Sequence, residues 1–152
     1  MKKFLIYFLM LLPLAIASCG GDDKDEPQST ANDPEGTVLM YLHHGNGVQY
    51  AHFVGPGYSV GDWINVDESN NFSALNGQIA SIGKVKGIGN IKSIPTSGWA
   101  KKAAIVPGYG YVAKDSYDGK TAYGRFYVVD FITSTDGGII GAIVKYQEDW
   151  QP

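Results

Sequence analysis

The feature that most constrains the fold is the absence of a helical apolar period after the first 18 residues. A helix that packs against a core needs apolar side chains about every 3.6 residues, and no window of about 12 residues after residue 18 shows this spacing. Short runs instead alternate apolar and polar residues, and 20 glycines punctuate them. We therefore predict a mostly β fold, a single antiparallel β-sandwich or small β-barrel of about seven or eight short strands.

The alternating runs place the strands and two hairpins. Residues 37–43 and 48–54 flank Gly45-Asn46-Gly47, a combination typical of a β-hairpin. Residues 123–133 and 139–147 flank a Gly-rich turn and predict a second hairpin. The run 123–133 is apolar on both faces, which predicts a central strand between two layers. The other expected strands cover residues 63–67, 78–85, 103–106 and 109–114.

The first residues have the order of a secretory signal peptide. Lys2 and Lys3 precede an apolar run over residues 4–17, which is shorter than the ~20 residues that a spanning helix needs. The small residues Ala17 and Ser18 before Cys19 resemble the lipobox of bacterial lipoproteins. That resemblance implies cleavage of a signal helix (1–18) and acylation of Cys19. Several acyl chains together give stable membrane attachment.

Charge divides the remaining chain into a tether and a domain. Residues 20–36 hold six acidic residues, one lysine and almost no large apolar side chain, so residues 19–36 are expected to form a disordered, flexible acidic tether. Residues 37–152, the predicted β-rich globular domain, hold nine acidic and nine basic residues. This neutral balance argues against a nucleic-acid partner, which needs clustered lysines and arginines. The sequence does not set the oligomeric state.

Several segments in combination are similar to a known family. They are residues 83–89, Ile94-Pro95, Gly98-Trp99-Ala100, residues 107–113, residues 127–130 and residues 138–147. Together they resemble an uncharacterised family of small Bacteroidetes lipoproteins that carries a domain of unknown function, over roughly residues 37–150. The resemblance implies a bacterial origin and a place on the outer membrane, exposed at the cell surface. It implies no catalytic residue.

Aromatic and histidine side chains supply the candidate binding residues. Trp63, Trp99 and Tyr109 are candidate ligand contacts, because Trp and Tyr combine apolar area with a polar tip, although packing in the core is the ordinary role of such residues. His43 and His52, with His44 beside them, would lie near the loop of the first hairpin. These histidines are the basis of an alternative function, the capture of a metal ion or haem. The simpler interpretation is that they are solvated side chains at the end of a hairpin.

Candidate catalytic residues are few. The chain has no Gly-x-Ser-x-Gly motif, and its one cysteine excludes an intrachain disulfide and a cysteine-based zinc site. Asp130 falls within an apolar strand, so we expect it to be buried with Arg125 or a backbone donor as partner; a hydrolase built on it is the weaker alternative. We therefore expect a lipid-anchored, non-enzymatic protein without a cofactor. Its task would be to bind a glycan, a peptide or a partner protein, or to serve as a subunit of a surface assembly.

Overall fold

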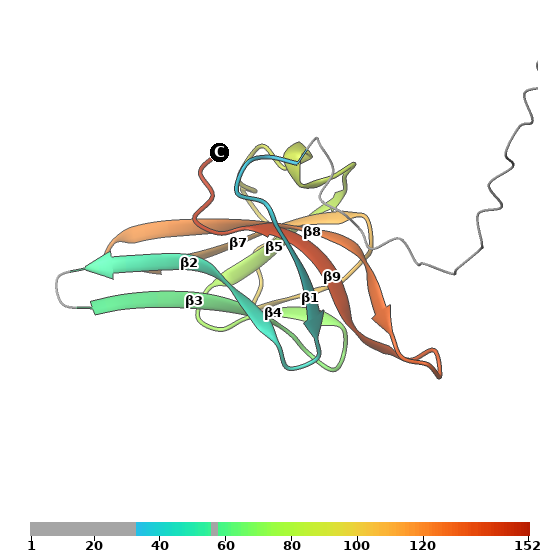
Figure 1. Cartoon of the computed structure of the whole chain (residues 1–152). Coiled ribbons are helices and arrows are strands. Elements are labelled where there is room, and N and C mark those ends of the chain that lie inside the picture. Colours follow the sequence, from blue (N-terminus) through green and yellow to red (C-terminus); the bar gives the residue numbers. More distant parts are fainter. Residues whose placement is uncertain (1–32, 56–57) are drawn as a thin grey trace, which may run out of the picture.

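The computed structural model describes residues 33–55 and 58–152. Its described part contains nine strands and one short 3₁₀ helix (Figure 1). In chain order these are β1 (Val38–His43), β2 (Gly47–Gly55), β3 (Tyr58–Val66), β4 (Asn71–Ala74), β5 (Gln78–Lys84), η1 (Ile88–Asn90), β6 (Lys102–Ala104), β7 (Tyr109–Tyr117), β8 (Lys120–Thr133) and β9 (Ile139–Gln147).

The strands form two antiparallel sheets that face each other. One sheet has the order β1-β9-β8-β7-β5 and the other the order β2-β3-β4-β6. This arrangement confirms the predicted mostly β, antiparallel fold and is a sandwich rather than a closed barrel. The strand that the sequence pattern missed is β4, because its four residues are too few to show an alternation.

The prediction that the first two strands form a hairpin is wrong. β1 pairs with β9, from Val38 opposite Tyr146 to His43 opposite Gly141, whereas β2 pairs with β3. The Gly45-Asn46-Gly47 segment carries the chain from one sheet to the other. The chain bonds to both sheets here, because His44 N–H, just before this segment, donates to Ile140 O (2.9 Å) and Gly45 N–H donates to Val66 O (2.9 Å).

The second hairpin is confirmed. β8 and β9 pair antiparallel, and β8 lies at the centre of the five-stranded sheet, as its apolar composition predicted. The pairing skips Val129, since Val128 lies opposite Val144 and Asp130 opposite Ile143. Such a β-bulge reverses which face each later residue occupies.

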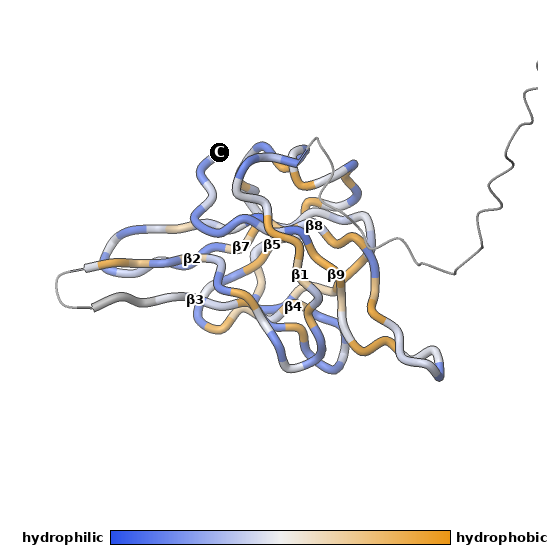
Figure 2. Tube along the Cα trace, viewed as in Figure 1, coloured by the Kyte–Doolittle hydropathy of each residue, from blue (hydrophilic) through white to orange (hydrophobic). Residues whose placement is uncertain are grey.

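The main core lies between the two sheets. Its large side chains are fully buried aromatic and β-branched residues that meet at the inner faces, and the Phe72 and Tyr111 rings pack edge to face at 5.2 Å. The Tyr111 hydroxyl donates to Ala104 O (2.7 Å) and so links β7 to β6 in the opposite sheet. Hydrophobic residues concentrate along the strands, and hydrophilic residues mark several of the connecting turns (Figure 2).

A second apolar cluster covers the outer face of the five-stranded sheet. It contains Ile88 and Ile91 around η1, together with Val112 and Trp150. The Arg125 guanidinium lies in this layer, where Nη1 donates to Ile91 O (2.7 Å) and the charge sits 5.0 Å from the Trp150 ring centre. The five-stranded sheet is therefore packed on both faces.

The described chain begins with a buried ion pair. Lys145 Nζ on β9 lies 2.7 Å from Asp33 Oδ2, and both side chains are 8% exposed. The last residues of the expected tether therefore contact the sheet. The expected signal peptide, Cys19 and most of the tether lie outside the described residues. Within the described residues, no helix is long and apolar enough to cross a membrane.

Candidate functional site

The outer face of the four-stranded sheet presents an ordered set of side chains. In β3, Ile64 and Val66 point into the core, so Trp63 and Asn65 point outward. Gln49 lies opposite Trp63 on one side, and Leu75 N–H donates to Trp63 O (3.0 Å) on the other. These three residues form the first row across the sheet.

A second row lies two residues further along β3. Asn65 is opposite Ser73, and Ser73 is opposite Lys102. Neighbouring strands are about 4.8 Å apart and the two rows about 7 Å apart. We call these residues the Trp63 face: Gln49, Trp63, Leu75, Asn65, Ser73 and Lys102.

The Trp63 face carries exposed apolar surface at its centre. The Trp63 side chain is 43% exposed and Leu75 is 60% exposed. The short helix η1 packs against β8, on the other sheet, and so leaves this face uncovered by a helix of the described residues.

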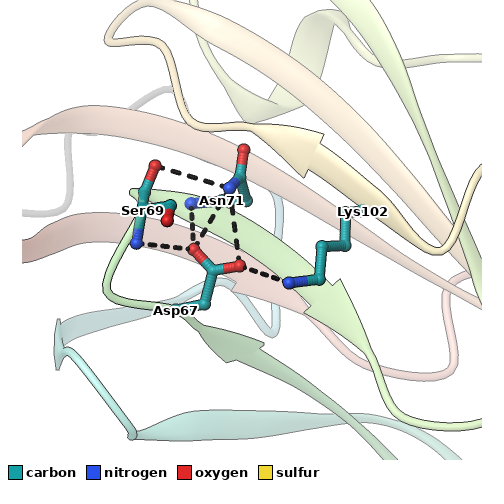
Figure 3. A network of polar contacts seen from close by, with 4 residues as sticks. All are labelled: Asp67, Ser69, Asn71 and Lys102. Atoms are coloured by element: carbon teal, nitrogen blue, oxygen red, sulfur yellow. Dashed lines mark hydrogen bonds and ion pairs between the residues drawn. The ribbon is translucent and has the colours of Figure 1, made fainter.

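A polar network closes one end of the Trp63 face (Figure 3). Asp67 Oδ1 accepts from the backbone N–H groups of Ser69 (3.0 Å) and Asn71 (2.9 Å), and its Oδ2 accepts from Lys102 Nζ (2.8 Å). The Lys102 ammonium, with these hydrogen bonds, lowers the pKa of the Asp67 carboxyl to about 2. Because Asp67, at the end of the face, balances Lys102, the face and Asp67 together carry no net charge in the pH range where both are ionised.

The three aromatic residues that the sequence singled out do not come together. Trp99 packs against the second apolar cluster on the five-stranded sheet, where its indole N–H donates to Pro95 O (3.2 Å) and Lys114 Nζ lies 4.1 Å from its ring centre. Tyr109 packs against the main core. Trp63 therefore stands apart from both.

The prediction that His43 and His52 lie close together is wrong, because the hairpin that would have joined them does not form. His43 ends β1 in one sheet and His52 lies on β2 in the other, opposite Gly61. His44 Nε2 hydrogen-bonds to Asn70 Oδ1 (2.9 Å). No group of three or more His, Cys, Asp or Glu side chains in the described part of the chain is placed to hold a metal ion.

Asp62 is a fully buried carboxylate, a feature common in functional sites, and the sequence analysis did not single it out. It is fully buried on β3, and its carboxylate accepts from the Tyr50 hydroxyl, from Gly77 N–H (3.1 Å) and from Trp63 N–H (2.9 Å). No residue larger than glycine fits at Gly77, because a Cβ there would overlap Lys114 O and the Tyr50 hydroxyl. One signal was present, since Asp62 has the same strand parity as Ile64 and Val66 and therefore the same inward face.

A second carboxyl group lies beside Asp62. Burial raises the pKa of Asp115 on β7, and the hydrogen bond and charge of Asp62 raise it further, whereas Lys101 lowers it. Burial and the bond to Asp62 also raise the pKa of Tyr50. Asp62 belongs to the four-stranded sheet and Asp115 to the five-stranded sheet, and the Tyr50 hydroxyl beside Asp62 also donates to Lys114 O on β7 (3.3 Å). This cluster therefore fits a structural link between the sheets.

The prediction that Asp130 is buried is wrong. The bulge at Val129 turns Asp130 away from the core, where it is exposed and its carboxylate accepts from the next backbone N–H, that of Phe131 (2.8 Å). Arg125 is not its partner, because Arg125 bonds to Gln147 Oε1 (2.5 Å) and Ile91 O. Phe131 takes the inward position and packs against the core.

Comparison with known families gives one match. The family described as Domain of unknown function (DUF5036) matches residues 61–151. This chain belongs to that family. Neither a curated protein nor a solved structure matches it.

Some of the site residues lie within the DUF5036 match and others precede it. Asp62, Trp63, Asp67 and Asp115 fall within it, whereas Tyr50 on β2 precedes it. The matched residues span β4 to β9 and most of β3. β1 and β2, which complete the two sheets, lie outside the match.

Proposed function

We propose that this DUF5036 protein is a non-enzymatic, lipid-anchored binding protein of a Bacteroidetes cell surface. The basic start, the short apolar run and the small residues before Cys19 support export and acylation at Cys19. The acyl chains would hold the protein on the outer membrane, and the acidic tether would separate the domain from it.

We propose further that the Trp63 face binds a neutral glycan. The observation that carries this proposal is the indole of Trp63, 43% exposed on the outer face of the four-stranded sheet, with amide and hydroxyl side chains at neighbouring strand positions. An indole offers a flat apolar surface on which a sugar ring can stack. Gln49, Asn65 and Ser73, which lie on β2, β3 and β4 around Trp63, offer both donors and acceptors to sugar hydroxyls.

The charge of the face favours a neutral ligand over an acidic one. The cationic group among its residues, Lys102, is already paired with Asp67 at 2.8 Å. An acidic sugar would therefore have to displace Asp67 from Lys102 to gain a charge-assisted bond. A peptide or protein ligand is the competing occupant that the experiment must separate.

The experiment compares two variants on arrays of neutral glycans, acidic glycans and peptides. Trp63→Ala is expected to weaken neutral-glycan binding about 30-fold, the effect of losing about 2 kcal/mol from a central aromatic contact. Val54→Ala is the matched control, because Val54 is exposed on β2 and lies outside the Trp63 face. Equal binding by wild type and Trp63→Ala would reject the face, and peptide-only binding would reject the glycan.

The anchor needs a separate measurement. Mass spectrometry of the mature native protein is expected to show an acylated amino-terminal Cys19. A product that retains the leader and an unmodified Cys19 would reject the lipoprotein proposal without affecting the glycan result.

A further inference from the structure

Each sheet of the sandwich has two edge strands. By strand order these are β1 and β5 in one sheet and β2 and β6 in the other. An edge strand exposes unpaired backbone N–H and C=O groups, and proteins usually shield such edges with bulges, charges, short length or a covering segment.

Three of the four edges are shielded in this way. β2 carries a bulge between Gln49 and Ala51 and is covered by Asp149, which bonds to Tyr50 O (3.1 Å) and to His52 N–H (2.9 Å). The other two shielded strands lie at the opposite end of the sandwich. β5 is bulged and bridged by Ala100, and β6 has three residues and begins with a lysine.

In residues 33–55 and 58–152, none of these protections is present at β1. Its sequence, VLMYLH, contains no acidic residue, lysine, arginine or proline, and it pairs with β9 without a bulge over all six residues. Among the described residues, no other strand pairs with it. Val38, Met40 and Tyr41 are exposed, and most of β1 is hydrophobic (Figure 2).

The direction of the backbone groups follows from the pairing with β9. His44 N–H donates to Ile140 O (2.9 Å), and hydrogen-bonding groups alternate between the two sides of a strand. The groups of Met40 and Leu42 therefore also face β9, whereas those of Leu39, Tyr41 and His43 face the free edge. The His43 carbonyl is partly used, because it accepts from Asn46 N–H (2.9 Å).

We propose that the protein forms a two-fold symmetric dimer in which β1 pairs antiparallel with β1 of a second copy, centred on Tyr41. In this register Tyr41 exchanges both backbone hydrogen bonds with Tyr41 of the second copy. Leu39 C=O accepts from His43 N–H of the second copy, and the symmetric bond repeats this on the other side. The two five-stranded sheets then join into one continuous sheet.

The composition of β1 makes a second copy the best-matched occupant. Self-pairing brings no like charges together, because β1 has no acidic residue, lysine or arginine. In this register the exposed Met40 lies opposite Leu42 of the second copy. A register centred on Met40 instead of Tyr41 would need Thr37 N–H, which already donates to Pro34 O (3.1 Å).

The test uses the chain from Gly20 onward, because residues 33–152 contain both sheets and their shared core. This chain lacks Cys19, the one cysteine of the sequence, so an introduced cysteine is unique. Sedimentation is expected to show twice the mass of one chain. Tyr41→Cys should form an oxidised or bismaleimide-linked dimer, because residues opposite each other in a hydrogen-bonded pair lie about 5.5 Å apart.

Two further variants complete the experiment. Val54→Cys, an exposed position on another strand, should not cross-link. Tyr41→Lys places two ammonium groups opposite each other and should raise the dimer dissociation constant at least about tenfold, with an unchanged circular dichroism spectrum. A monomeric wild type, or equal cross-linking of the two cysteine variants, would overturn the proposal.

Discussion

Replacement of Asp62 by alanine is expected to remove a large part of the stability of the domain. Two buried donors, the Tyr50 hydroxyl and Gly77 N–H, would lose their carboxylate acceptor. A buried unsatisfied donor costs about 1–3 kcal/mol, and the Tyr50 hydroxyl keeps a second, longer bond to Lys114 O (3.3 Å), so we expect a total loss of about 3 kcal/mol. The donors of Trp63 and Asn76 are only partly buried and can turn to water at little cost.

This loss can be measured by urea unfolding followed by tryptophan fluorescence. Domains of this size typically have a stability of about 5–15 kcal/mol, and a decrease of about 3 kcal/mol lowers Tm by roughly 12 °C. Asp130→Ala is the matched control, because Asp130 is an exposed aspartate whose backbone bond is local, and it should change the stability by about 0.5 kcal/mol or less. A loss below about 1 kcal/mol for Asp62→Ala would refute the reasoning.

Two further predictions concern charged groups. The pKa of Asp115 is raised above its ordinary 3.8, so the folded state holds this proton more tightly; the resulting stability is complete below pH 3.8 and is lost as the pH rises through the raised pKa. Asp115→Asn should therefore flatten this decline in urea midpoint with pH, and an unchanged profile would contradict the assignment. Lys145→Met removes the cation that pairs with the buried Asp33 and should lower the free energy of unfolding by about 3 kcal/mol. Adding Asp33→Asn should recover most of this loss. A double variant as unstable as Lys145→Met would show that the ion pair is not the cause.

The candidate site was only partly accessible from the sequence. Trp63 could be named as a candidate because tryptophan is rare and amphipathic, but its neighbours Gln49, Ser73 and Lys102 come from three other strands. Local patterns carry no information about which strands become neighbours. Asp62 was missed because the predicted strand began at Trp63, one residue after Asp62, whereas β3 begins at Tyr58.

The sequence by itself determined the β character of the domain, the positions of most strands and the final hairpin. These properties are local, because alternation, β-branched side chains and turn residues act over a few neighbouring positions. Tertiary structure alone decided that β1 joins β9 instead of β2, and that the bulge at Val129 exposes Asp130 and turns Phe131 inward. The physical reason is that strand partners and register are chosen by the burial of two sheet faces against each other, a condition that involves residues about a hundred positions apart.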